Sequence, residues 1–194
     1  MRGTAAGIAL LLCALGVVWA AQEWRFNRAI ADQQGAAAVH FWPENPFGWR
    51  VLSEQQLVTG ATAAAVASAR HAVQLSPEDW QSWDALAQVQ VEVGDLTGAR
   101  ASMAQMAVRA HGFEAHWRYA NLLLLSSDMP GFWREATRAL SFAPPTEIPV
   151  VLTYMQTVSN QDIERVAQVV TAARANMPMP VSYTHLRAHE TGRN

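Results

Sequence analysis

Lysine is absent from this chain of 194 residues, and cysteine occurs once, at Cys13. All 14 basic residues are therefore arginine, set against 16 acidic residues, and the formal net charge is −2. A mildly acidic chain with scattered arginines lacks the basic stripe that a nucleic acid requires, so we expect no nucleic-acid partner. A single cysteine also excludes a disulfide within the chain.

Recognisable catalytic motifs are missing as well. The sequence has no G-x-S-x-G, no P-loop, no dinucleotide fingerprint and no paired C-x-x-C. The acid pair Glu78-Asp79 fits the start of a helix better than a general acid and base. Four histidines are spread over different expected helices and turns, and we interpret them as structural: His40, His71, His111 and His116. We therefore expect no enzymatic activity, no catalytic residue and no cofactor.

The C-terminal segment has a different character from the rest of the chain. The letters VSYTHLRAHET, residues 181–191, resemble the translation of a transposase-type sequencing adapter. We therefore expect residues 181–194 to be non-native and the natural reading frame to run past Pro180. His185 and His189 lie four residues apart beside Glu190, but this order differs from the H-E-x-x-H of zinc proteases. No third ligand is indicated by spacing, so we expect no metal site.

The most informative pattern is a set of residues that recurs after 34 positions. The first copy is Trp49, Leu52, Gly60, Ala65, Ala72 and Pro77, and the second is Trp83, Leu86, Gly94 and Ala99. A third copy follows one residue early and contains His116, Tyr119, Ala120, Ser127, Ala139 and Pro144. Repetition at this period is typical of stacked helical hairpins.

Each repeated residue type suits one place in a helical hairpin. Small alanines let two helix backbones approach, and the Trp and Leu residues fill the space between the helices. Glycine readily takes the left-handed conformation that ends a helix, and proline cannot continue a helix interior. The pattern resembles the tetratricopeptide repeat (TPR) family. That resemblance implies an all-α chain built as an α-solenoid of TPR helical hairpins, and the uncharged N-terminal stretch adds a transmembrane or signal helix before them.

The register of the pattern divides the chain into segments. Three full repeats are expected at 46–79, 80–112 and 113–146, followed by a weaker fourth hairpin at 147–180 that ends with Ala173 and Pro178. Residues 23–45 form a partial leading repeat or helical linker. Within it, Ala31, Ala38 and Pro43 fit the second helix of a hairpin.

The N-terminal stretch 3–22 contains no charged residue. A helix of this length, at about 1.5 Å per residue, matches a hydrocarbon core of about 30 Å. A cleavable signal peptide is the alternative, with cleavage after Ala20. Leu12 before Cys13 matches a lipoprotein motif poorly. The length of the apolar run favours an uncleaved single-pass anchor in the bacterial inner membrane, and the short N-terminal tail favours repeats on the periplasmic side.

The family resemblance implies a concave groove lined by the first helix of each hairpin, where a protein or peptide partner binds. The matching positions are Arg50, Glu54, Asp84, Gln88, Trp117 and Asn121. Their polar groups suit an extended backbone and Trp117 offers a flat apolar surface, although an ordinary solvated face has the same composition. Glu54, Glu114 and Ala85 stand where a chaperone-tail clamp needs Lys or Asn, which argues against that kind of ligand.

Two further segments bear on the function. GFEAHWRYANLLLL (112–125) and DMPGFWREATRAL (128–140) look like parts of envelope-associated bacterial TPR proteins encoded near polysaccharide polymerases. The sequence therefore predicts a membrane-anchored scaffold that binds partner proteins in cell-envelope or surface-polysaccharide assembly. Two alternatives remain. One is a soluble periplasmic binding module released by signal cleavage, and the other is an accessory domain of a larger membrane glycan polymerase or ligase.

Overall fold

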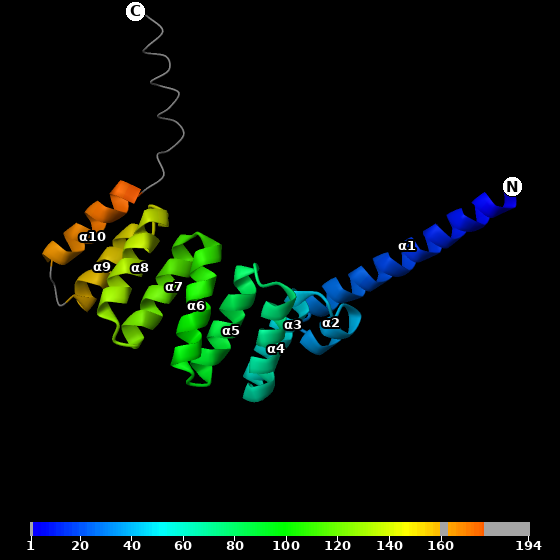
Figure 1. Ribbon diagram of the computed structural model, residues 1–194, viewed down its shortest axis with the longest axis horizontal. Coiled ribbons are helices and arrows are strands. Elements are labelled where there is room, and N and C mark those ends of the chain that lie inside the picture. The colour runs from blue at the N-terminus through cyan, green and yellow to red at the C-terminus, as the bar shows by residue number, and fades with distance from the viewer. Residues whose placement is uncertain (1, 160–162, 177–194) are drawn as a thin grey trace, which may run out of the picture. The chain divides into compact units, whose positions relative to one another are not determined.

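The computed structural model describes residues 2–159 and 163–176, with side chains at 15–159 and 164–175. These residues form ten α-helices and no strand (Figure 1). The expected all-α class is therefore confirmed. The chain separates into two compact units between Ala110 and His111. The expected adapter tail at 181–194 and Pro178 lie outside the described residues.

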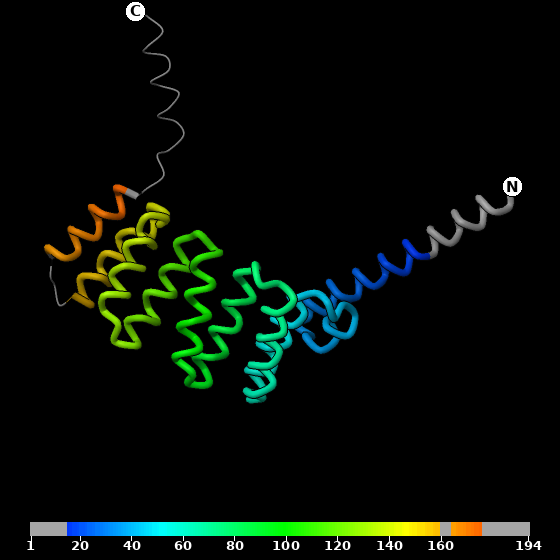
Figure 2. The backbone as a smooth tube through the Cα atoms, in the orientation of Figure 1, coloured from blue at the N-terminus to red at the C-terminus, as the bar shows by residue number. Residues whose placement is uncertain are grey.

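The helices follow one another with short connections, as the backbone trace shows (Figure 2). The first unit contains α1 (Arg2–Ala31), α2 (Gly35–Phe41), α3 (Pro46–Val58), α4 (Thr62–Leu75), α5 (Trp80–Glu92) and α6 (Leu96–Ala110). The second unit contains α7 (Phe113–Leu125), α8 (Met129–Phe142), α9 (Ile148–Val158) and α10 (Ile163–Asn176).

Helix α1 runs without interruption across the boundary that the sequence suggested between residues 22 and 23. No proline or glycine stands near that point to end a helix. The C-terminal end of α1 packs against α2 through the buried residues Phe26, Ala29 and Ala38. The spacing of Ala31 had suggested that it belongs to the second helix of this leading hairpin. That prediction is wrong, because Ala31 is the last residue of α1. Across the described residues, no helix combines the length and apolar character needed to cross a membrane.

Completely buried alanines recur where the helices of the first unit pack together. Helix α3 packs on α4, and α5 packs on α6. Ala65 and Ala72 on α4, Ala87 on α5 and Ala99 on α6 are all completely buried. Small side chains let helices approach each other closely, and Ala65 packs with the larger Leu86 and Val89 of α5.

One hydrogen bond occurs identically in the hairpins α3–α4 and α5–α6, which we call the first and second hairpins; α7–α8 is the third. The indole Nε1–H of Trp49 donates to the carbonyl of Pro43 at 2.7 Å, and that of Trp83 donates to the carbonyl of Pro77 at 2.7 Å. The indole ring fills the gap between helices while its polar edge finds an acceptor in the preceding turn. In the 34-residue pattern, each Trp is therefore hydrogen-bonded to the Pro that ends the preceding repeat.

A second hydrogen bond also repeats, between the two helices of a hairpin. The side chains of Gln56 on α3 and Ser68 on α4 are joined at 2.7 Å. Gln90 on α5 and Ser102 on α6 are joined in the same way at 2.6 Å, and both are buried. Each bond satisfies polar atoms that would otherwise be buried without a partner.

The turns inside the hairpins α3–α4, α5–α6 and α7–α8 each contain a residue with positive φ. Gly60 and Gly94 have φ values of +77° and +78°, and Ser127 takes the same role in the third hairpin at +60°. Each turn is closed by a backbone bond that reaches back to the helix. In the third hairpin the Asp128 N–H donates to the Leu123 carbonyl at 2.8 Å. A serine here is strained relative to glycine because its Cβ crowds the backbone.

The second unit is built around α8, which contacts both α7 and α10. Leu123 on α7 and Phe132, Ala136 and Ala139 on α8 are completely buried. The Ser141 hydroxyl donates to the carbonyl of Ala173 at 3.3 Å, which fixes α10 against the C-terminal turns of α8. Helix α9 completes this unit through its contact with α10.

The strain at Ser127 generates a first prediction. Replacing it with glycine, Ser127→Gly, should raise the free energy of unfolding by about 1 kcal/mol, because glycine relieves the positive φ. The matched control is Ser126→Gly at the preceding residue, where φ is −85° and the hydroxyl donates to the Leu122 carbonyl. That control should be destabilising. Urea unfolding measures both, and a loss of stability in Ser127→Gly would contradict the argument.

Candidate protein-binding groove

The groove of the first unit lies between α3 and α5, the first helices of consecutive hairpins. Both helices begin at a residue whose side chain caps the free backbone N–H groups of the first turn. Asn45 Oδ1 accepts from the Phe47 N–H at 2.9 Å, and Asp79 Oδ1 accepts from the Gln81 N–H at 3.1 Å. The caps stand 34 residues apart, so the two helices start in the same register and contact each other side by side.

Between these helices is an open pocket of about 350 Å³. It is lined by Phe47, Arg50, Val51, Ser53, Glu54, Leu57, Trp80, Gln81, Asp84, Ala85, Gln88 and Val89. Four of the six residues expected in a groove therefore line one pocket: Arg50, Glu54, Asp84 and Gln88. The other two, Trp117 and Asn121, belong to α7 in the second unit.

Arg50 connects the two helices at one end of this pocket. Its Nη1 donates to Asp79 Oδ2 at 3.0 Å and to Gln81 Oε1 at 2.6 Å, while its guanidinium lies 4.8 Å from the centre of the Phe47 ring. Burial lowers the pKa of Arg50, and the negative charges of Asp79 and Asp84 oppose that effect. Arg50 is thus a structural cation whose charge is matched within the protein.

The aromatic residues of the pocket lie at the start of its two helices. Phe47 and Trp80 lie in the first turns of α3 and α5, and both are exposed. Glu54 follows Phe47 by seven residues, which places it about 10 Å further along the helix. Asp84 faces the same pocket from α5 and accepts a hydrogen bond from Gln88 Nε2 at 2.9 Å. The pocket therefore has aromatic rings where its helices begin and the carboxylate of Glu54 further along α3.

Trp117 is surrounded by aromatic side chains of its own unit. It stacks on Phe113 with ring centres 6.3 Å apart and meets the edge of Tyr154 on α9 at 5.4 Å. The side-chain amide of Asn121 donates to the Trp117 carbonyl at 2.9 Å, within α7. The two residues expected to contact a ligand are therefore engaged in contacts inside the second unit.

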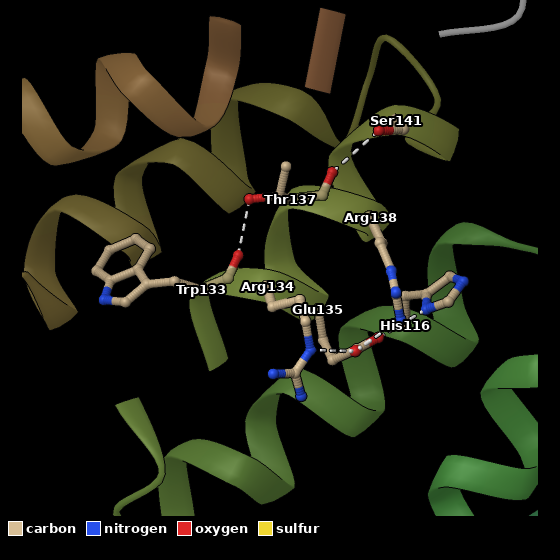
Figure 3. Close-up of polar contacts among 7 residues, drawn as sticks. All are labelled: His116, Trp133, Arg134, Glu135, Thr137, Arg138 and Ser141. Carbon is tan, nitrogen blue, oxygen red and sulfur yellow. Dashed lines mark hydrogen bonds and ion pairs between the residues drawn. The ribbon is translucent and has the colours of Figure 1, made fainter. Parts of the chain in front are cut away.

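The second unit also contains an ionic cluster centred on Glu135, which the sequence analysis did not single out (Figure 3). His116 Nδ1 lies 3.0 Å from Glu135 Oε2, and both side chains are buried. Arg138 Nη1 and Arg134 Nε bind the other oxygen at 2.9 and 3.2 Å. The imidazole also stacks on Phe142 at 5.7 Å. The buried pair joins α7 to α8 inside the second unit.

Charge and burial have opposite effects on Glu135. Burial alone raises the pKa of this carboxyl group, but the hydrogen bond with His116 and the positive charge of Arg138 outweigh burial. The net result is a pKa below the ordinary value of 4.5. Glu135 is therefore ionised near neutral pH, and its ionised form is favoured by folding.

The repeat register contains the signal that would have revealed this pair. The step that carries Trp49 to His116 also carries Ser68 to Glu135. Trp49 and Ser68 each make one of the two repeated hydrogen bonds in the first hairpin. In the third hairpin both positions change together, and the new residues bind each other. A histidine and an acid at two positions that form interhelical or turn hydrogen bonds in the other hairpins indicate such a pair.

Comparison with known proteins supports the fold. The crystal structure of MamA, a TPR-like protein, matches with a TM-score of 0.58 at 9% sequence identity, over 78% of this chain and 93% of that chain. At this identity the likeness concerns the fold alone, which is a TPR-type helical repeat in an α-solenoid. No protein-family model and no curated protein sequence matches the chain.

The Glu135 cluster generates a prediction on pH. Because the folded-state pKa is lowered, the stabilisation from the ionised carboxylate is complete above the unfolded value of about 4.5 and disappears as the pH falls through the folded value. Glu135→Gln should lower the free energy of unfolding by about 2 kcal/mol at neutral pH. The difference from the parent protein should shrink below about pH 4.5.

The matched control for this measurement is Glu114→Gln, which neutralises an exposed acid on α7. Urea unfolding of the parent and both variants at a series of pH values provides the comparison. Equal stability of parent and Glu135→Gln at neutral pH, or a difference that does not change with acidification, would contradict the assigned role of this carboxylate.

Proposed function

We propose that this protein is a scaffold that binds partner proteins through the groove between α3 and α5. The observation that carries the proposal is the convergence of Arg50, Glu54, Asp84 and Gln88 on one open pocket. A TPR-type helical repeat is a fold whose surfaces generally bind protein partners, which supports the same function. The exposed aromatic rings of Phe47 and Trp80 add apolar area that a partner would bury.

Site-specific photocrosslinking tests the groove directly. A photoreactive amino acid at Gln88 should form covalent adducts with partner proteins in cells, because Gln88 is exposed and lines the pocket. The matched control replaces Gln74, an exposed glutamine near the end of α4 that does not line the pocket. Adducts should form from position 88 and not from position 74. Equal crosslinking from both positions, or none from position 88, would remove the groove as the binding surface.

The proposal also includes a membrane anchor formed by residues 3–22, with the repeats in the periplasm and a role in cell-envelope or surface-polysaccharide assembly. The support is the uncharged sequence of this stretch together with apolar side chains exposed along α1: Leu15, Val17, Val18, Trp19 and Trp24. Tryptophan is enriched where a membrane meets water. The assembly role rests on the resemblance of segments 112–125 and 128–140 to envelope-associated TPR proteins.

Cell fractionation of a charged variant tests the anchor. Leu15→Lys places a positive charge within the apolar stretch, which costs about 3 kcal/mol in a membrane-spanning helix, and should move the protein out of the membrane fraction. The control Ala31→Lys adds the same charge at the exposed end of α1, outside residues 3–22, and should leave the distribution unchanged. A parent protein recovered without the membrane would contradict the anchor, and N-terminal sequencing would then show whether cleavage occurs after Ala20.

A further inference from the structure

Helix α1 is exposed on every side before it meets the rest of the first unit. All residues at 15–21 are exposed, and four of them are large and apolar: Leu15, Val17, Val18 and Trp19. Burial begins at Phe26 and Ala29, where α1 packs against α2. A helix that is apolar all round is buried either in a protein core or in a membrane, and the first unit supplies no core around residues 15–21.

Helix α2 runs back alongside α1 (Figure 1), and three contacts fix its height along that helix. The ring of Trp42, the residue after α2, meets the ring of Trp19 at 6.4 Å and that of Phe26 at 5.5 Å, both edge to face. Trp19 and Phe26 are about 10 Å apart along α1, so Trp42 lies level with the residues between them. At this height Gln22 Nε2 donates to the Phe41 carbonyl at 2.5 Å. The C-terminal end of α2 therefore lies beside Gln22, the last residue of the uncharged N-terminal stretch.

The hydrogen bond between Gln22 and Phe41 suits a place where water is scarce. The Phe41 carbonyl belongs to the last turn of α2, where carbonyl groups have no donor within the helix. The Gln22 amide is the first polar side chain after the apolar residues 15–21. Each group satisfies the other, so neither is left unpaired at the edge of a membrane.

The exposed tryptophans of α1 are spread over the thickness of a membrane interface. Trp19 and Trp24 are 60% and 67% exposed, and the five-residue step between them is about 7.5 Å along the helix. The polar layer on each side of a bilayer is about 5 to 8 Å thick, and tryptophan is enriched there. Arg25 is exposed directly after Trp24, at the height where lipid phosphates accept hydrogen bonds from arginine.

From these contacts we infer that the α1–α2 hairpin rests on a phospholipid bilayer, with Trp42 as a membrane contact in addition to the anchor helix. Trp19, Trp24 and Trp42 form an aromatic seat at the level of the lipid headgroups. This inference rests on the proposed anchor and goes beyond it, because an anchor alone requires no contact between α2 and lipid.

A seat at this height also brings the protein-binding groove to the membrane. Helix α3 begins at Pro46, four residues after Trp42, and four residues span at most about 14 Å. Phe47, in the first turn of α3, lines the groove. In this arrangement the groove begins close to the bilayer surface, within reach of proteins that are themselves held at the membrane.

Photocrosslinking to lipid tests the seat with the full chain in phosphatidylcholine vesicles. A photoreactive aromatic amino acid replaces Trp42 in one protein and Phe47 in the matched control. Phe47 is 42% exposed whereas Trp42 is half-buried, so exposure alone would favour adducts from position 47. We expect at least about fivefold more lipid adducts from position 42, because its ring lies in the headgroup layer.

A second measurement keeps an aromatic ring at the seat. Trp42→Phe retains the contacts with Trp19 and Phe26, and Trp133→Phe is the matched control at a buried residue of α8. The vesicles contain phosphatidylcholine brominated near the top of its acyl chains, which quenches tryptophans that touch lipid. The quenched fraction of tryptophan emission should fall in Trp42→Phe, because a tryptophan in contact with lipid is removed. It should rise slightly in Trp133→Phe, because a tryptophan away from lipid is removed.

The outcomes separate the seat from the anchor, because flotation of each protein with the vesicles reports the anchor by itself. The seat is overturned if position 42 forms no more lipid adducts than position 47, or if the quenched fraction is unchanged in Trp42→Phe. If the protein floats with the vesicles in that case, the anchor remains and α2 lies clear of the bilayer. If the protein does not float, the anchor and the seat both fail.

Discussion

The close approach of two helix backbones at buried alanines is the constraint on which the hairpins depend. Ala65, Ala72 and Ala99 have no exposed surface, and any larger side chain there would push the paired helices apart. Once the helices are close, the polar groups between them need partners. In the first hairpin the indole of Trp49 and the side-chain pair Gln56–Ser68 form such hydrogen bonds. The second hairpin forms the same two bonds.

The third hairpin shows that the same backbone arrangement accepts a different set of polar contacts between its helices. Its alanines remain, as Ala139 is also completely buried, but the repeated hydrogen bonds are replaced by the pair of His116 and Glu135. Both positions differ from those of the other hairpins. They are not adjacent in sequence, but their side chains contact each other in the interior of the second unit. A buried ion pair needs both partners, since either charge alone would be costly in that environment.

The sequence predicted the all-α repeat fold because it depends on residue types at fixed intervals, which a chain shows directly. It could not predict partners that meet only in space. The role of Trp80 in the groove and the contact of Glu135 with His116 depend on which helix faces which. The sequence also did not reveal that α1 ends at Ala31, because the turn that follows contains no glycine. The residue with positive φ there is Gln33 at +53°, and glutamine does not signal a turn as glycine does.

One series of helix-cap residues explains how the arginine of the groove is held. Asn45, Asp79 and Gly112 precede α3, α5 and α7 at equivalent positions. Asparagine caps a helix as well as aspartate does, but only the carboxylate of Asp79 can also bind Arg50 as an ion pair. That ion pair matches the charge of the one cation in the pocket. The cap of α5 therefore also holds the guanidinium of Arg50 on α3, so one carboxylate fixes both the start of a helix and the side chain that connects it to the neighbouring hairpin.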